Sequence, residues 1–147
     1  MGVNKKVIPF MVAQIAHETN NFTSIQLLKN NNGAGITYIN NPYQINAHRA
    51  SELPEDKNYH YAKFDTIQDF ANDYLRILKY GIDKPINSNS LEEFAKRLKN
   101  NGFYSDTLDN YTKGLKFFYK KYAGVFNAAN LPLFILGIAL LYIIVLK

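Results

Sequence analysis

No charged residue occurs between Ala123 and Leu146, and this stretch limits where a folded domain can lie in the 147-residue chain. As a helix rising about 1.5 Å per residue, it would reach roughly 36 Å, which exceeds the thickness of about 30 Å of the hydrocarbon core of a bilayer. The sequence therefore predicts one domain over residues 1–122 and a single transmembrane anchor over residues 123–147. A buried core helix or a hydrophobic partner-binding tail is the alternative for the apolar stretch.

The composition bounds the chemistry of the chain. Cysteine is absent, which excludes a disulfide framework and a thiolate metal site. The formal charge of +5 and the eleven tyrosines suit a protein that works near polyanions or sugars. Neither feature is specific, and we expect no specific nucleic-acid partner.

Four segments predict helices. Thr66-x-x-Asp69 approximates a capping box and Ser90-x-x-Glu93 is a second helix start, and an apolar stripe at helical spacing follows each. Between the first two helices, the stretch 20–58 is rich in Asn, Gly and Pro, with short β-like pieces around 36–39, and predicts a loop or a small hairpin lobe. The predicted helices are 6–19, 66–80, one from Ser90 that ends at Gly102, and one that begins at Asp106 or Thr107.

Glu18 stands at the end of the first apolar segment, where burial would disfavour its charged form. Glycoside-cleaving enzymes use this effect to keep a proton on a general acid near neutral pH. Glu18 is therefore the first candidate for catalysis, and a solvated Glu at a helix end is the alternative. Residues 1–16 imitate a signal peptide, but cleavage near Ala16 would remove the helix that carries Glu18, so we expect them to be retained.

Four blocks of sequence occur in order along the chain. The first combines Ala-Gln-x-x-His-Glu-Thr over 13–19 with Asn-Asn-x-x-Gly-Ile over 31–36. The second, over 61–75, places an aromatic residue, an Asp and a Thr before an amphipathic helix, and the third is the helix at 90–99. The fourth is Gly-Phe-Tyr-Ser-Asp over 102–106, followed by Asn-Tyr at 110–111. Together these blocks resemble the glucosaminidase family of peptidoglycan hydrolases (glycoside hydrolase family 73), which includes flagellar muramidases and many phage lysins.

The resemblance implies an α+β, mostly helical, lysozyme-like domain with a small irregular or β lobe and a groove beside it. It implies Glu18 as the general acid. The family often places a tyrosine in its groove. By strict register that position is Phe103, so the neighbouring Tyr104 is the second catalytic candidate, with packing as its alternative. The substrate-binding positions that the resemblance implies are Gln14, Asn31, Asn32 and Phe103.

No motif selects a second catalytic carboxylate. An activated water or the acetamido group of the substrate is the alternative for that role. Asp65 is more simply a structural residue ahead of the helix at Thr66. The carboxylates in or beside the small lobe are Glu52, Glu55, Asp56 and Asp65.

A metal site finds no support in the sequence. His17 and Glu18 match only the first half of the His-Glu-x-x-His zinc motif, because residue 21 is Asn. His48 and His60 have no partner at ligand spacing. We therefore predict no catalytic metal and no cofactor.

The leading hypothesis is a membrane-anchored glycosidase that cleaves peptidoglycan, with a lytic transglycosylase as its close relative. An enzyme domain joined to one span, without an evident export signal, is an arrangement typical of bacteriophages. We therefore expect a virion-associated enzyme of phage entry, located in a virion membrane or the host envelope. The expected partners are peptidoglycan, lipid through residues 123–147, and other virion proteins. The alternatives are a non-catalytic glycan-binding or structural membrane protein of the virion, or a holin-like membrane protein.

Overall fold

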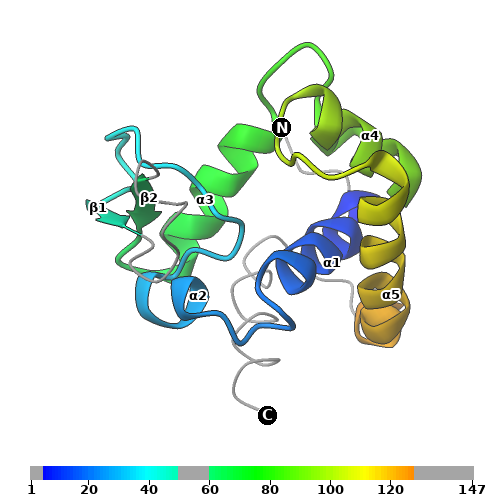
Figure 1. Cartoon of the computed structure of the whole chain (residues 1–147), viewed down its shortest axis with the longest axis horizontal. Coiled ribbons are helices and arrows are strands. Elements are labelled where there is room, and N and C mark those ends of the chain that lie inside the picture. The colour runs from blue at the N-terminus through cyan, green and yellow to red at the C-terminus, as the bar shows by residue number, and fades with distance from the viewer. Residues whose placement is uncertain (1–4, 50–59, 128–147) are drawn as a thin grey trace.

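The computed structural model describes residues 5–49 and 60–127, and over this part of the chain the fold is mostly helical with one small sheet. Figure 1 shows two groups of elements, with α2, α3 and the sheet on one side and α1, α4 and α5 on the other. The short 3₁₀ helices are η1 (Lys5–Val7) and η3 (Pro85–Asn87). The longer elements are α1 (Ile8–Glu18), α2 (Ile25–Asn30), β1 (Asn46–Arg49), β2 (His60–Lys63), α3 (Ile67–Leu78), α4 (Leu91–Asn100) and α5 (Leu108–Asn127).

Helix α1 is apolar on nearly every side and forms the centre of the core. Eight of its residues are buried, which explains why so few polar residues interrupt it. Pro9 lies in its first turn, where a missing N–H costs no helical hydrogen bond. The helix predicted over 6–19 is therefore confirmed.

The starts of α3 and α4 follow the predicted capping chemistry. The Thr66 hydroxyl accepts from the Asp69 N–H while the Asp69 carboxylate accepts from the Thr66 N–H, which completes a capping box. At α4, the Ser90 hydroxyl accepts from the Glu93 N–H at 3.1 Å. Gly102 has a φ of +75° just beyond α4, a backbone conformation that glycine adopts without strain. These helices, and the helix expected near Thr107, are confirmed.

The loop or small hairpin lobe predicted over 20–58 is confirmed in part, because β1 lies there and pairs antiparallel with β2, but it is wrong in two respects. It contains the helix α2, which the Ser24 hydroxyl caps by accepting from the Leu27 N–H, and which ends at Asn31 in the left-handed conformation. The strands also lie later than expected: β1 pairs antiparallel with β2, while the β-like piece at 36–39 contributes one isolated bridge from Thr37 to Tyr61. The prediction failed because α2 is short and is specified by its caps rather than by an apolar stripe.

The side chain of Asn32 joins two segments of the small lobe through hydrogen bonds. It is buried, its amide donates to the carbonyls of Ile36 and Ala62 at 2.9 Å each, and its carbonyl accepts from the Ile36 N–H. The neighbouring Asn31 donates to the carbonyls of Phe64 and Asp65. Both asparagines therefore tie the turn after α2 to the end of β2.

A buried carboxylate attaches the lobe to α3. Asp73 is fully buried and accepts from the side chains of Asn41 and Gln44, each at 2.8 Å, and from Nε of Arg76 at 2.6 Å. Charge-assisted hydrogen bonds from three donors offset the cost of burying the charge. The loop before β1 and the helix α3 therefore form one unit.

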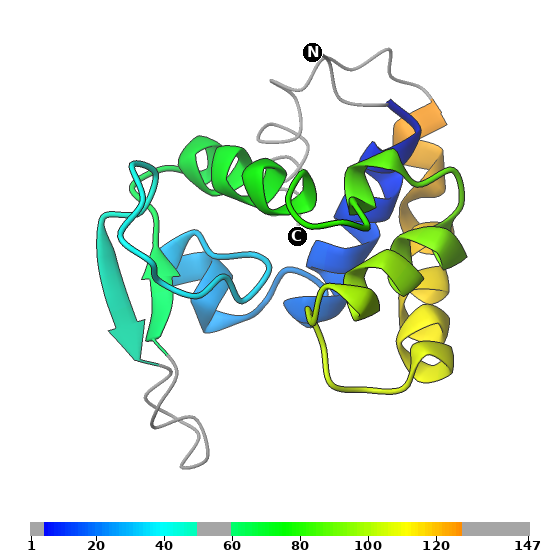
Figure 2. The same ribbon diagram turned by 90° about the horizontal axis from the view of Figure 1, so that it is seen from above.

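The two groups of elements meet at α1, as Figure 2 shows from above. Gly33 makes this approach possible, because a Cβ there would lie 2.9 Å from Cγ2 of Ile15 and 3.1 Å from Cζ of Phe70. On the other side α1 packs against α5, where a Cβ on Gly114 would lie 2.7 Å from Nδ1 of His17. Two glycines thus set how closely the neighbouring segments approach the central helix.

The predicted membrane anchor falls largely on residues that the structure does not describe. Helix α5 continues to Asn127, five residues into the predicted anchor, and residues 128–147 lie outside the described part. Among the helices that the structure describes, none is both long and apolar enough to cross a bilayer. The boundary predicted between 122 and 123 therefore falls inside a continuous helix.

We predict that Gly114→Ala lowers stability, although alanine normally favours a helix by about 1 kcal/mol over glycine. The new methyl group would meet the His17 ring, which Tyr111 and Phe118 confine, so we expect a loss of about 1–3 kcal/mol in the free energy of unfolding. Urea denaturation followed by circular dichroism measures it. In a His17→Ala background the same substitution should stabilise the protein, and destabilisation there would contradict this account.

Candidate active site

Glu18 is the last residue of α1 and is exposed to solvent. Its Oε1 accepts a hydrogen bond from the hydroxyl of Tyr111 on α5 at 2.5 Å. The expectation that this carboxyl is buried in apolar surroundings is wrong, because Glu18 has an exposed face at the end of the helix while its Oε1 contacts Tyr111. The exposed face is open to a substrate.

Tyr111 lies directly behind Glu18 and is 4% exposed. Its ring stacks on Tyr104 at 3.5 Å between centroids, and the His17 ring meets it edge-on at 5.0 Å. Burial, and then the negative charge of Glu18, raise the pKa of Tyr111 well above its usual range. Tyr111 therefore keeps its proton and acts as the hydrogen-bond donor to Glu18.

Gln14 lies one turn before Glu18 on α1, in the core. It is 1% exposed, and its side-chain oxygen accepts from the hydroxyl of Tyr74 on α3. The sequence placed Gln14 among substrate-binding residues. The structure places its side-chain oxygen against the Tyr74 hydroxyl instead.

Tyr104 and Phe103 belong to the loop between α4 and α5. The Tyr104 hydroxyl donates to the Ala95 carbonyl at 2.9 Å, so it points toward α4, while its ring supports Tyr111. Lys99 fixes this loop by donating to the carbonyls of Ser105 and Asp106 at 3.0 and 2.6 Å. The loop thereby presents its aromatic residues to the centre of the molecule.

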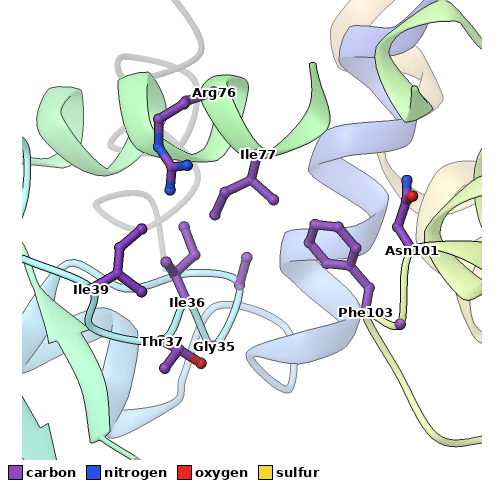
Figure 3. A pocket seen from close by; sticks show the side chains of 10 residues that line it. Gly35, Ile36, Thr37, Ile39, Arg76, Ile77, Asn101 and Phe103 are labelled. Atoms are coloured by element: carbon purple, nitrogen blue, oxygen red, sulfur yellow. The ribbon is translucent and has the colours of Figure 1, made fainter. Parts of the chain in front are cut away.

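A cavity of about 330 Å³ separates the small lobe from the α4–α5 loop. Figure 3 shows Phe103 on one wall, facing Ile77 of α3 and the turn at Gly35 and Ile36. Arg76 also lines this cavity, while its Nε is bound to Asp73. Glu18 does not line the cavity. Its hydrogen-bond partner Tyr111 stacks on Tyr104, and Tyr104 directly follows the lining residue Phe103. The remaining lining residues are Ala34, Thr37, Ile39, Asn101 and Gly102.

The other expected site residues occupy different positions. Asn31 and Asn32 hold the turn that leads into the cavity wall at Gly35, so they shape the groove from behind. The backbone carbonyl of Asp65 accepts from Asn31 next to the start of α3, in line with its expected structural place. The three remaining carboxylate candidates, Glu52, Glu55 and Asp56, lie outside the described residues.

Metal-ligating side chains do not gather in the described part of the chain. Within residues 5–49 and 60–127, no group of three or more His, Cys, Asp or Glu side chains could hold a metal ion.

Residues 2–124, which contain every site residue described above, match the family model "Glucosaminidase: Mannosyl-glycoprotein endo-beta-N-acetylglucosaminidase". The chain belongs to the glucosaminidase family. The family resemblance in the sequence is thereby confirmed, and the protein is a glycosidase. No curated protein and no solved structure matches it.

The sequence of this glucosaminidase predicts no role for Tyr111 or Tyr74. Tyr111 stands in the block that resembles the family, and its position on an inward face of the last helix was the signal for burial. A stripe of apolar residues at helical spacing predicts that Tyr111 is buried. Which group its hydroxyl contacts depends on how α5 packs across α1. The contact with Glu18, 93 residues away in sequence, therefore could not be anticipated.

For this glucosaminidase we predict that Tyr111→Phe lowers kcat more than Tyr104→Phe does. The first substitution removes the hydrogen bond to Glu18, and a bond to a charged group is worth about 1.5–3 kcal/mol, which corresponds to roughly 10-fold to 100-fold in rate. Tyr104→Phe removes a bond to the Ala95 carbonyl and should mainly lower the melting temperature. Steady-state kinetics with thermal denaturation compares the two variants. A larger kcat loss in Tyr104→Phe would instead favour Tyr104 as the catalytic tyrosine.

Proposed function

We propose that this glucosaminidase is a peptidoglycan hydrolase with Glu18 as its general acid. The observation that carries the proposal is an exposed carboxylate whose inner oxygen is held by a buried tyrosine, in a chain of this family. The match to the family model supports cleavage at N-acetylglucosamine. The two-sided arrangement around the cavity supports a lysozyme-like domain, in which a glycan strand lies between the lobe and the helices.

Glycosidic cleavage requires a proton for the leaving oxygen and stabilisation of an oxocarbenium-like transition state. Glu18 supplies the proton from the oxygen that faces solvent, because Tyr111 engages the other one. The stabilising group is a second carboxylate of the small lobe, an activated water or the acetamido group of the substrate. Glu52, Glu55 and Asp56 are the candidates for the first of these.

The cavity walls suit a sugar strand. The Phe103 ring offers an apolar face, and the side chains of Arg76 and Asn101 and the backbone at Gly35 offer polar groups nearby. Aromatic rings that pack on sugar faces, combined with a few fixed polar groups, are common in sites of this kind. We assign substrate contact in the groove to Phe103, and to Asn31 and Asn32 through the turn that they hold.

We also propose that residues 123–147 anchor the enzyme in a membrane. Four lysines, at 113, 116, 120 and 121, precede this segment and one, Lys147, follows the uncharged stretch, so the positive-inside rule favours a domain on the cytoplasmic face. A membrane that is later enclosed in a virion turns that face toward the capsid, where the enzyme would meet peptidoglycan during entry. A phage entry enzyme, in contact with other virion proteins, accounts for this orientation better than a free lysis enzyme does.

We predict that Glu18→Gln abolishes cleavage and leaves the fold intact. The amide keeps the shape of the side chain but has no transferable proton, and loss of general acid catalysis costs on the order of 10²-fold to 10⁴-fold. Release of reducing sugars from purified cell wall measures the activity, and circular dichroism checks the fold. Glu92→Gln, at an exposed site on α4, is the matched control and should be active. A folded Glu18→Gln variant with normal activity would refute the assignment.

The products of peptidoglycan cleavage show which glycosidic bond is broken and by which mechanism. We expect mass spectrometry of the released muropeptides to show N-acetylglucosamine at the new reducing ends, as the family description indicates. Reducing-end N-acetylmuramic acid would indicate a muramidase. Anhydro-muramic products would indicate a lytic transglycosylase, which needs little more than one Glu.

Truncation after Asn127 tests the anchor and keeps α5 whole. The shortened protein should digest isolated wall but no longer co-sediment with lipid vesicles, whereas the full chain should do both. Membrane binding by the truncated protein would contradict the assignment. In inverted host vesicles, whose cytoplasmic face points outward, added protease should digest the domain of the full chain, and protection would contradict the proposed orientation.

A further inference from the structure

Arg76 carries the charge in the cavity between the small lobe and the α4–α5 loop. Of the ten described residues that line this cavity, the others are apolar residues, glycines and neutral polar residues. The Arg76 side chain is 39% exposed, and Figure 3 shows it pointing from α3 toward the segment that carries Ile36 and Ile39. A ligand in this cavity therefore meets a guanidinium group.

Asp73 holds this guanidinium along one edge. The fully buried carboxylate accepts from Nε of Arg76 at 2.6 Å, and the side-chain amides of Asn41 and Gln44 each donate to it at 2.8 Å. Among the described residues, none accepts a hydrogen bond from Nη1 or Nη2, the two terminal nitrogens of Arg76. Arg76 therefore has a fixed orientation, and its outer donors are available to a ligand.

We infer that Arg76 is a specificity-determining residue that binds a carboxylate of the glycan strand. This inference rests on the proposed function as a peptidoglycan hydrolase. The terminal N–H groups of a guanidinium form a planar fork that matches the two oxygens of a carboxylate. Because Asp73 already fixes the side chain, a ligand does not have to order it, which lowers the cost of binding.

The charge of Asp73 does not cancel this preference. Asp73 lies on the Nε side of the guanidinium, and its charge is shared with the two amide donors. A ligand carboxylate at Nη1 and Nη2 would be closer to the positive group than to Asp73. The buried carboxylate therefore weakens the attraction and leaves the directed donors in place.

Carboxyl groups distinguish a peptidoglycan strand from a strand of N-acetylglucosamine alone. Each N-acetylmuramic residue bears a lactyl group, whose carboxylate is free in a strand without peptides. In a substituted strand this group forms an amide with the stem peptide, which brings carboxylates of its own. Both sources offer the same chemistry to Arg76, and a chitin oligosaccharide offers neither. Arg76 should therefore select acidic strands over neutral ones.

A purely structural role for Arg76, as the partner of Asp73, makes a different prediction. Loss of that role would lower stability and weaken the binding of acidic and neutral strands alike. Loss of a carboxylate contact would weaken the binding of acidic strands alone. A comparison of ligands on one and the same variant separates the two roles, because the stability of the protein is then the same in each measurement.

The test measures binding by isothermal titration calorimetry with the full-length chain in detergent. The Glu18→Gln background keeps the strands uncleaved. The ligands have equal length: peptide-free strands, peptide-bearing strands, peptide-free strands whose carboxylates are converted to amides, and chitin oligosaccharides. We expect Arg76→Gln to raise the Kd of acidic strands by about 10-fold, the lower end for a charge-assisted hydrogen bond because the site is partly exposed. The Kd of neutral ligands should change by less than about twofold.

The acidic ligands identify the source of the carboxylate. A loss with peptide-free strands assigns the contact to the lactyl group, and a loss with peptide-bearing strands alone assigns it to the stem peptide. Arg97→Gln is the matched control, because Arg97 also pairs with carboxylates, those of Glu93 and Asp83, but does not line the cavity. This variant removes the same charge from the chain and should bind every ligand within about twofold of the protein that keeps Arg97.

Two further measurements cover an Arg76→Gln variant that is too unstable to assay. The double variant Asp73→Asn/Arg76→Gln removes the buried charge together with its partner, and it should show the same selective loss. The amidated strand needs no substitution at Arg76. If the contact is made to the lactyl carboxylate, this strand should bind about 10-fold more weakly than the acidic strand; if it is made to the stem peptide, amidation of the peptide-bearing strand should have that effect.

Equal losses for acidic and neutral strands in the Arg76 variants would overturn the inference. Equal binding of acidic and amidated strands by the protein that keeps Arg76 would do so as well. The same selective loss in Arg97→Gln would also overturn it, because net charge would then explain the selectivity. Failure of the proposed function has a different signature, which is cleavage of cell wall by folded Glu18→Gln or no binding of any strand, and the inference then fails with it.

Discussion

Burial of α1 on nearly all sides is the constraint on which the rest of the structure depends. A helix with so few polar positions has to be covered from several directions, and no single neighbouring helix can do this. The chain covers it with α5 on one side and with the segments around Gly33 and Phe70 on the other. The two-sided architecture, and the cavity between the sides, follow from this requirement.

The same constraint explains where the proposed general acid lies. Most residues of α1 are buried, whereas Glu18 at its end is exposed. A catalytic carboxylate needs a fixed position and an accessible face. A residue at the solvent end of the most buried helix has both, because the helix fixes its backbone and its neighbours Tyr111 and His17 fix its surroundings.

Local signals predicted the parts of this fold that local interactions determine. Thr66, Ser90 and Gly102 marked helix ends correctly, because caps and left-handed glycines act within a few residues. The lobe was predicted less well: α2 has only six residues, and Asn32 gains its role from carbonyls that β2 brings to it. At the proposed site, the motif singles out Glu18, but it does not predict the partners of Gln14 and Tyr104, since the approach of α3 to α1 and the fold of the α4–α5 loop against α4 decide them.

The length of α5 has a mechanical consequence. Tyr111 near its start and Asn127 at its end are on one helix of 20 residues, so about 24 Å of rigid rod separates the tyrosine that holds Glu18 from the point where the chain continues. Because the helix is rigid, it fixes the direction of Asn127 relative to Tyr111 as well as the distance between them. The end of α5 at Asn127 is therefore held at a fixed distance and in a fixed direction from Glu18, the proposed general acid.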